Sequence, residues 1–329
     1  MMRYPRISII IPARHVDRYL EECIKHCLAL RYPDFEIIIL LDEKEIVENI
    51  KVDDRLRIVV AGNISPWNKR RLGAESATGE YVALIDGDAF PSEKWLEKAV
   101  RNFEDEDVIA VLGPAVTPKE DTILQKASGC VFLSSLVGGM YGYRYVQKER
   151  RIVHDCHTCN FIVPKGLFLE VARASDVNYW PGEDTKLYLD LTARGGAKGK
   201  IVYDPEALVY HHRKKLFIPH LKQMWGYVTT PFILNGRNFF SKILHILPVW
   251  LVIGGVTTII LTSLGMINPF ITLLLIGIYL FAVLLSSLLA CGKSDFKIVP
   301  LVFAGIILTH IVYGVGFIKY LTTGRGRNL

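Results

Sequence analysis

Neither cysteine nor net charge is abundant in this 329-residue sequence, and each shortage excludes a class of protein. Six scattered cysteines are too few for a secreted disulfide scaffold, which favours a reducing compartment such as the cytosol. A net charge of +6 is modest, so the composition does not indicate a nucleic-acid partner. Charge is also nearly absent from residues 243–322, whereas residues 1–240 carry almost all of it. Such a shift marks a domain boundary and indicates that the C-terminal part lies in a different solvent.

Three long apolar stretches make up this C-terminal part, at about 243–264, 269–291 and 298–321. Each reaches the roughly 20 residues that a helix needs to cross a bilayer. The alternative, a helical core of a soluble domain, is disfavoured because such cores seldom contain uncharged runs of this length. His310 lies inside the last stretch and is expected to be a packed neutral imidazole rather than a functional group. We therefore predict a transmembrane region of about three helices over residues 241–329.

Lysine and arginine residues predict the orientation in the membrane. Arg237 and Lys242 precede the first apolar stretch, and two lysines lie in the loop before the last one. This distribution places the N-terminal domain and that loop on the cytosolic side. Three crossings would then put Arg325 and Arg327 outside, against the rule. Either the tail is an exception or one of the stretches does not fully cross.

Residues 214–240 mix apolar, aromatic and basic side chains, which is typical of an amphipathic helix that lies in the membrane interface. The basic residues around this segment could attract a lipid phosphate or could only fix the topology, and both interpretations stay open. They are Arg213, Lys214, Lys215, Lys222, Arg237 and Lys242.

Residues 1–213 show short apolar runs that alternate with amphipathic segments. The runs predict buried strands at 7–11, 35–41, 56–60, 81–85 and 108–112. Because helical patterns separate them, we predict one α/β domain with a mostly parallel central sheet. Residues 114–180 are harder to interpret and are expected to hold helices around 122–137 and 164–173 with a loop between them.

Polar residues follow several of these strands, at the sheet edge where open α/β sheets bind ligands. The segments are Pro12–Arg14, Asp42, Gly62-Asn63 and Asp86-Gly87-Asp88. In extended backbone Asp86 and Asp88 would point the same way and could hold one Mg²⁺ or Mn²⁺. Because Asp-Gly is also a common turn, the motif alone leaves both possibilities open.

A Cys-x-x-Cys pair, Cys156 and Cys159, is flanked by His154 and His157 and raises the possibility of a zinc site. No second Cys-x-x-Cys pair accompanies it in the sequence. We therefore expect these cysteines to serve the fold rather than a structural zinc ion.

A set of motifs occurs in order along residues 5–230. It comprises Ile9–Pro12, Tyr32–Ile37, Gly73, Ala77–Tyr81, Asp86–Asp88, Pro91, Trp95-Leu96, Thr158–Asn160, Gly182–Asp184 and Tyr203–His212. This set resembles the GT-A nucleotide-sugar domain of family 2 glycosyltransferases. The ordered set is far more specific than any one motif, and the resemblance implies a GT-A catalytic domain over residues 1–213.

The resemblance also implies residue roles, which we state as expectations. On the donor side, Pro12, Ala13 and Arg14 would line the nucleoside pocket, and Asp42 would hold the base or ribose. Arg70 would lie near the base and the phosphates. Asp86 and Gly87 would lie near the ribose. The metal would be bound by Asp88, Asp86 and His211, with His212 as the reserve choice for the histidine. The general base would be Asp184, supported by Glu183, and the acceptor side would include Asn160 and Trp180.

The chemistry is consistent with these roles. Displacing a nucleoside diphosphate builds negative charge on the leaving phosphates, and a divalent ion stabilises that charge. An acceptor hydroxyl needs a base because its own pKa is high. Glu183 and Asp184 begin a predicted helix, whose dipole is expected to keep Asp184 ionised.

Three departures from the family pattern limit the resemblance. Asp42-Glu43 stands where Asp-Asp is frequent, and Arg71 stands where Asn is usual. The Gln-x-x-Arg-Trp motif is reduced to Gln223-Met224-Trp225, which argues against a processive polysaccharide synthase.

The sequence as a whole thus resembles a metal-dependent inverting hexosyltransferase, anchored in the cell membrane by several crossings, with its catalytic domain in the cytosol. The expected partners are membrane lipids, a UDP- or GDP-linked sugar, and a hydroxyl of a lipid-linked or cell-envelope glycan, with Mg²⁺ or Mn²⁺ as cofactor. Two alternatives stay open. One is transfer to polyprenyl phosphate, an anionic acceptor that needs no base, and the other is a non-catalytic membrane scaffold that binds nucleotide sugars.

Overall fold

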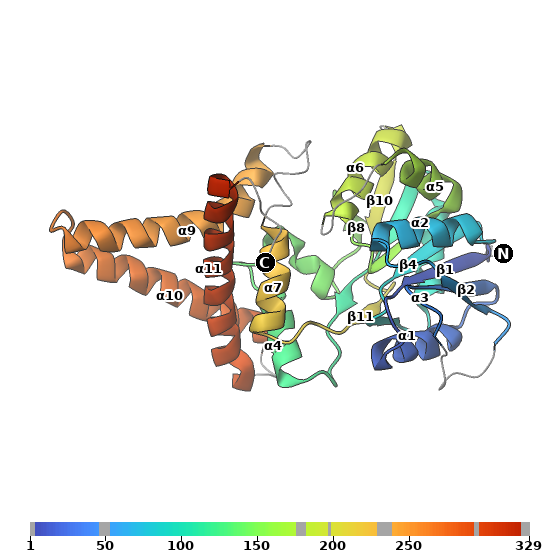
Figure 1. Ribbon diagram of the computed structural model, residues 1–329, viewed down its shortest axis with the longest axis horizontal. Coiled ribbons are helices and arrows are strands. Elements are labelled where there is room, and N and C mark those ends of the chain that lie inside the picture. The colour runs from blue at the N-terminus through green and yellow to red at the C-terminus, as the bar shows by residue number, and fades with distance from the viewer. Residues whose placement is uncertain are drawn as a thin grey trace. The chain divides into compact units, whose positions relative to one another are not determined.

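The computed structural model describes residues 4–45, 53–175, 182–196, 199–228, 239–292 and 296–323 (Figure 1). The chain divides into two compact units. Unit 1 combines Met1–Pro118 with Tyr143–His212, and unit 2 combines Lys119–Gly142 with Arg213–Leu329. The segment 119–142 therefore belongs with the C-terminal helices, although the two parts of unit 1 enclose it in the sequence.

Unit 1 is built on an eight-stranded sheet with the order β3-β2-β1-β4-β9-β6-β10-β8. The strands are β1 Ile7–Pro12, β2 Phe35–Leu41, β3 Leu56–Val60, β4 Tyr81–Ile85, β6 Val108–Leu112, β8 Arg151–Ile152, β9 Asn160–Pro164 and β10 Lys200–Tyr203. Strands β1 to β4 pair in parallel, as do β6 and β10. Strand β9 runs antiparallel between β4 and β6, and β8 is antiparallel to β10. The predicted mostly parallel sheet is confirmed.

Helices cover both faces of this sheet (Figure 1). They are α1 Arg18–Leu28, α2 Pro66–Ser76, α3 Trp95–Val100, α5 Lys165–Ala174 and α6 Glu183–Gly195. Along β1, Ile9 packs into the core under α1 and α3, while Ile10 packs on the opposite face with α2, α5 and α6. This alternation explains why β1 is apolar except for Ser8: both of its faces are buried.

A second, three-stranded sheet lies beyond the end of β4. Its order is β5-β11-β7, with β5 Ala89–Pro91, β7 Ala115–Val116 and β11 Val209–His211. Strand β11 is antiparallel to β5 and parallel to β7. It thereby brings the 209–211 segment against the residues that follow Asp86–Asp88.

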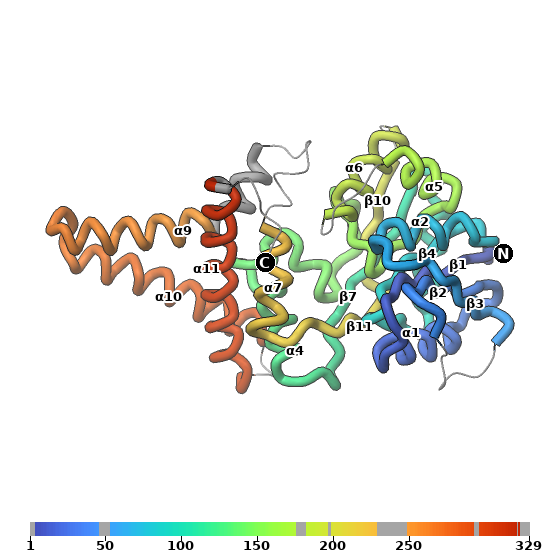
Figure 2. The backbone as a smooth tube through the Cα atoms, in the orientation of Figure 1, coloured from blue at the N-terminus to red at the C-terminus, as the bar shows by residue number. Residues whose placement is uncertain are grey.

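Unit 2 is helical and contains α4 Ile123–Leu133, α7 Ile218–Tyr227, α9 Phe239–Ser263, α10 Pro269–Cys291 and α11 Val299–Thr323. Helices α9 and α10 form an antiparallel pair joined by a short turn, and α11 runs across them (Figure 2). The Asn268 side chain caps α10, since it accepts a hydrogen bond from the Phe270 N–H before Pro269 starts the helix.

Two helices in the described part of the chain are long and apolar enough to cross a membrane, Pro269–Cys291 and Phe296–Tyr320. The part of α9 whose side chains are described, Val249–Ser263, is a shorter apolar helix. Many large apolar side chains of α9 and α10 are exposed, among them Trp250, Phe270 and Phe281. A helix that is apolar on its exposed face suits lipid rather than the core of a soluble domain.

His310 is fully packed, as expected. Its Nδ1 lies 3.0 Å from the Tyr279 hydroxyl and its Nε2 lies 3.0 Å from the Leu136 carbonyl oxygen. Both ring nitrogens therefore have partners within unit 2.

Candidate active site

The Asp86-Gly87-Asp88 segment leaves the end of β4 as a tight turn. The Ala89 N–H donates to the Asp86 carbonyl oxygen over 3.0 Å, and β5 starts at Ala89. The extended conformation considered from the sequence is therefore wrong, and the two carboxylates take separate partners. A Cβ on Gly87 would come within 3.4 Å of the Ala13 Cβ, so the turn lies against the end of β1.

Asp88 pairs with His211. The Asp88 Oδ1 lies 3.1 Å from the His211 Nε2, and both side chains are partly exposed. The pairing of β5 with β11 sets this contact, because His211 is the register partner of Ala89. The His212 ring instead lies 3.1 Å from the Glu22 carboxylate. The geometry therefore favours His211 over His212 as a potential metal ligand.

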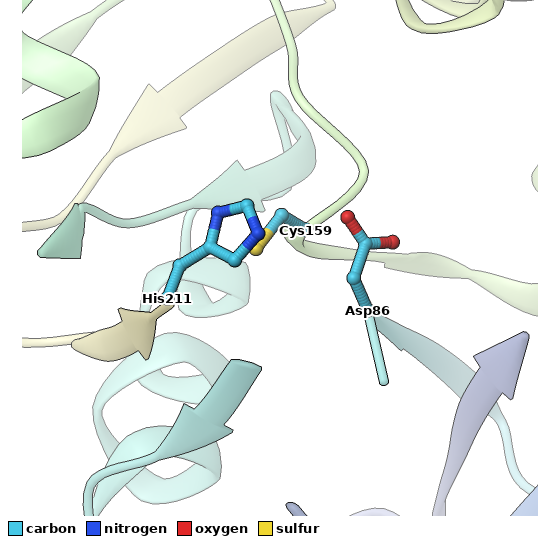
Figure 3. A group of neighbouring side chains, drawn as sticks. All are labelled: Asp86, Cys159 and His211. Atoms are coloured by element: carbon cyan, nitrogen blue, oxygen red, sulfur yellow. The ribbon is translucent and has the colours of Figure 1, made fainter. Parts of the chain in front are cut away.

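Asp86 lies close to the same histidine. One potential ligand atom from each of Asp86, Cys159 and His211 lies within 4.8 Å of the other two. Figure 3 shows the imidazole and the thiol side by side, with the Asp86 carboxylate near them. Sequence reasoning considered Cys159 only within the Cys-x-x-Cys pair, because its approach to Asp86 and His211 depends on how β9 pairs with β4.

Arg70 connects this cluster to the start of α6. The Arg70 Nη2 donates to Asp86 Oδ1 over 2.7 Å, and its Nη1 donates to Glu183 Oε1 over 3.3 Å. The guanidinium is buried on α2 between the two carboxylates. It offsets their charge and fixes their separation.

Glu183 and Asp184 open α6 after Gly182, whose φ of +115° is a conformation that favours glycine. Burial raises the pKa of Glu183 to about 7, and the nearby Asp184 adds to this while Arg70 opposes it. Burial also raises the pKa of Asp184, against the opposing charge of Arg144. Burial therefore acts against the helix dipole, which was expected to keep Asp184 ionised.

The ends of β1 and β2 meet at a buried lysine. The Lys69 ammonium group pairs with the Asp42 carboxylate and also donates to the Ala13 carbonyl oxygen. The Asp42 N–H donates to the Arg14 carbonyl oxygen over 3.2 Å, which ties the two strand ends together. Sequence reasoning missed Lys69, although its place beside Arg70 on α2 was an available signal.

Asn160 is enclosed by protein. Its Oδ1 accepts from Trp95 Nε1 over 2.8 Å, and its Nδ2 donates to the carbonyl oxygens of Pro114 and Ala207 over 2.9 and 2.7 Å. The side chain is fully buried, so it faces the interior rather than an acceptor. The predicted acceptor-side residue Trp180 lies outside the described residues.

The Cys-x-x-Cys pair does not converge. The Cys156 thiol donates to the Asp184 carbonyl oxygen over 2.8 Å, whereas Cys159 faces Asp86 and His211. His157 Nε2 lies 3.0 Å from the Gly113 carbonyl oxygen, and His154 Nδ1 lies 3.4 Å from the Tyr188 hydroxyl. These four residues do not form one ligand set.

Comparisons with known proteins agree with this architecture. Residues 8–171 match the family model described as Glycosyl transferase family 2. An uncharacterized glycosyltransferase of Haemophilus influenzae is 24% identical over 226 residues, which cover 64% of this chain and 66% of that protein. The match thus spans slightly less than two thirds of the relative.

Two other proteins match over nearly the whole chain. The dolichyl N-acetyl-α-D-glucosaminyl phosphate 3-β-D-2,3-diacetamido-2,3-dideoxy-β-D-glucuronosyltransferase of Methanococcus voltae is 20% identical, covering 97% of this chain and 98% of that protein. The solved mannosyltransferase PcManGT of Pyrobaculum calidifontis, in complex with GDP-Man and Mn²⁺, superposes with a TM-score of 0.60 at 16% identity. That superposition covers 96% of this chain and 88% of the other, and it confirms the predicted GT-A-like fold. Through its N-terminal domain, the chain belongs to glycosyltransferase family 2.

Proposed function

We propose that this protein transfers a sugar from a nucleotide-sugar donor to a hydroxyl of a lipid-linked glycan. The observation that carries the proposal is the chain of contacts from His211 and Asp88, through Asp86 and Arg70, to Glu183 at the start of α6. It places potential metal ligands and a carboxylate pair at one edge of the sheet, where α/β domains bind their ligands.

The potential ligand atoms at this edge of the sheet fit a divalent cation. Asp88 and Asp86 supply hard carboxylate oxygens and His211 supplies an imidazole nitrogen, which together suit Mn²⁺ and, less well, Mg²⁺. A bound ion would stabilise the negative charge that develops on the leaving diphosphate. Arg70 is always protonated and adds a fixed positive charge beside Asp86.

Asp184 is the proposed general base, and Glu183 positions it. Both carboxylates have raised pKa values because they are buried, which makes them better proton acceptors once ionised. Lys69 and Asp42 would hold the nucleoside end of the pocket together with Pro12, Ala13 and Arg14.

The relatives support the substrate classes. The name of the Methanococcus protein specifies a dolichyl-phosphate-linked sugar as its acceptor, and the Pyrobaculum structure contains GDP-Man and Mn²⁺. We propose a UDP- or GDP-linked donor and a lipid-linked acceptor for this chain. The apolar helices of unit 2 would anchor the protein in the cell membrane, with the catalytic domain in the cytosol.

The test is Asp184→Asn in the full chain, purified in detergent with Mn²⁺. Transfer to a hydroxyl acceptor should fall at least about 100-fold, because a general base typically contributes that much or more. Asp190→Asn is the matched control, since Asp190 lies on the same helix but pairs with Lys186. Its transfer rate should stay near the wild-type rate.

The other outcomes identify the alternatives. If Asp184→Asn spares transfer to polyprenyl phosphate and the wild type does not use hydroxyl acceptors, the phosphate is the acceptor and our proposal is wrong. If the wild type binds nucleotide sugars but turns over none of them, with or without Mn²⁺, the protein is a scaffold.

A further inference from the structure

We propose that the Cys159 thiol is a third protein ligand at the metal site, and that Asp86, Cys159 and His211 together bind a borderline-soft divalent cation of the Zn²⁺ class. The inference deepens the proposed function, because it concerns the same edge of the sheet. It assigns a role to one cysteine of the Cys-x-x-Cys pair that the proposed reaction leaves unused.

Strand pairing brings the three residues together. In the antiparallel pair of β4 and β9, Ile85 is opposite Asn160. Asp86 follows the last residue of β4 directly, and Cys159 directly precedes the first residue of β9. In the antiparallel pair of β5 and β11, Ala89 is opposite His211. Two strand pairs therefore end beside the turn after β4, which brings the three residues near one another.

The distances suit a single ion. Zinc lies about 2.0 to 2.3 Å from nitrogen, oxygen and sulfur ligands, so two ligand atoms of a tetrahedral site are roughly 3.3 to 3.8 Å apart. The ligand atoms of Asp86, Cys159 and His211 lie within 4.8 Å of one another. Side-chain rotations that shorten these separations by up to about 1.5 Å would close the site.

The ligand types select the ion. Thiolate and imidazole prefer Zn²⁺ and similar cations, whereas Mg²⁺ prefers oxygen ligands in an octahedron. Three protein ligands are also the number found in catalytic zinc sites, which keep a further position open. Asp88 lies 3.1 Å from His211 and would supply the oxygen ligand that Mn²⁺ prefers. The same cluster thus offers a soft ligand, the Cys159 thiolate, and a hard ligand, the Asp88 carboxylate.

Burial explains why a soft ion would be held firmly. Cys159 is 7% exposed and lies in the core beneath the turn, with α1 and β4. A cation held there would be shielded from water on the side of the sulfur, which strengthens its interaction with the thiolate. On binding, the thiol loses its proton to solvent and the metal takes its place.

The experiment uses Co²⁺ as an optical probe and Cd²⁺ as a soft competitor, with the full chain in detergent. Co²⁺ bound to a thiolate gives a charge-transfer absorption in the near ultraviolet, which oxygen and nitrogen ligands do not give. The wild type should show this band. Cys159→Ser should lose it and should bind Cd²⁺ at least about tenfold more weakly, since even outer-shell changes cost 10- to 100-fold in metal affinity.

Cys156→Ser is the matched control, because it removes the other buried thiol of the Cys-x-x-Cys pair. It should keep the band, and loss of the band in this variant would assign the metal to the Cys-x-x-Cys pair and overturn the proposal. Persistence of the band in Cys159→Ser would also overturn it.

Mn²⁺ binding separates this inference from the proposed function. It should change less than about threefold in Cys159→Ser, because its oxygen ligands remain. If wild type binds Mn²⁺ but gives no thiolate band with Co²⁺, Cys159 is not a ligand and the transferase proposal stands. If neither Mn²⁺ nor Co²⁺ binds in the presence of a nucleoside diphosphate, both proposals fail.

Discussion

Glu183 is the residue at which burial and charge compete most directly. Its carboxyl group is enclosed by Arg70, Asp184 and Asp86, and burial raises its pKa to about 7 from a usual value near 4.5. Between these two pH values the unfolded chain releases the proton while the folded chain retains it. Raising the pH through this window therefore favours unfolding, and the contribution of Glu183 to stability is complete only below about pH 4.5.

We predict that Glu183→Gln reduces this pH dependence. The folded wild type should lose up to about 3 kcal/mol of stability from this group between pH 4.5 and pH 7, and the variant should not. The measurement is the melting temperature of the full chain in detergent at pH 5 and pH 7.5. Glu104→Gln, at an exposed glutamate, should respond like the wild type. Equal responses of Glu183→Gln and wild type would contradict the prediction.

The individual site residues could be predicted only in part. Asp86, Asp88, Arg70 and His211 were available from the sequence because they belong to ordered motifs, and the structure brings them to one edge of the sheet. Lys69 was not, and Cys159 was considered only within the Cys-x-x-Cys pair, because their contacts join segments far apart in the chain. The sequence also did not reveal that burial raises the pKa of Asp184, since burial is a property of the folded state.

At the scale of elements, strands and helices were predicted well where the spacing of apolar residues along the sequence is regular. Strand β9 was missed, and residues 138–163 were expected to be a loop. An antiparallel strand inserted between β4 and β6 is stabilised by its neighbours on both sides rather than by its own five residues. Short strands such as β5, β7 and β11 escape prediction for the same reason, yet β5 and β11 position His211 beside Asp88.

Gly113 shows how tightly these short elements are joined. It lies between β6 and β7, and a Cβ there would be 1.8 Å from the Ala207 carbonyl oxygen. The backbone would have to move, and the Asn160 side chain that bonds to the same carbonyl group would move with it. We predict that Gly113→Ala destabilises the protein by at least about 2 kcal/mol.

Gly166→Ala is the matched control for this prediction. Gly166 lies in α5, and a Cβ there would meet no atom within 4 Å. Alanine should stabilise the helix by about 0.5 to 1 kcal/mol. Both changes are measured as shifts in melting temperature, which should have opposite signs. A Gly113→Ala variant as stable as wild type would show that the segments around Gly113 and Ala207 are not rigidly packed.

At the scale of the whole molecule, the apolar helices differ in what surrounds them. The most apolar 18-residue stretch of α10 is 17% buried, whereas the corresponding stretch within Phe296–Tyr320 is 44% buried. Helix α11 packs along α4 and α7: His220 lies 3.1 Å from the Thr309 hydroxyl, and a Cβ at Gly316 would lie 3.1 Å from Val228. Because α4 and α7 carry lysines, we expect them to lie at the membrane surface and α11 to lie there with them.

This arrangement removes the conflict between three crossings and the charge rule. If α9 and α10 cross as a hairpin and α11 does not cross, every basic cluster of the C-terminal part faces the cytosol. The turn at Gly265, which carries no charge, would then be the exposed point on the far side.

We predict that an epitope tag appended after residue 329 is digested by protease in inside-out vesicles, together with the catalytic domain. A tag inserted at Gly265 should be protected in the same vesicles, because the hairpin carries it to the other side. Detergent should make both tags accessible, which controls for tags that are folded away. Protection of the C-terminal tag would mean that α11 also crosses the bilayer, and the tail with Arg325 and Arg327 would then be a true exception to the charge rule.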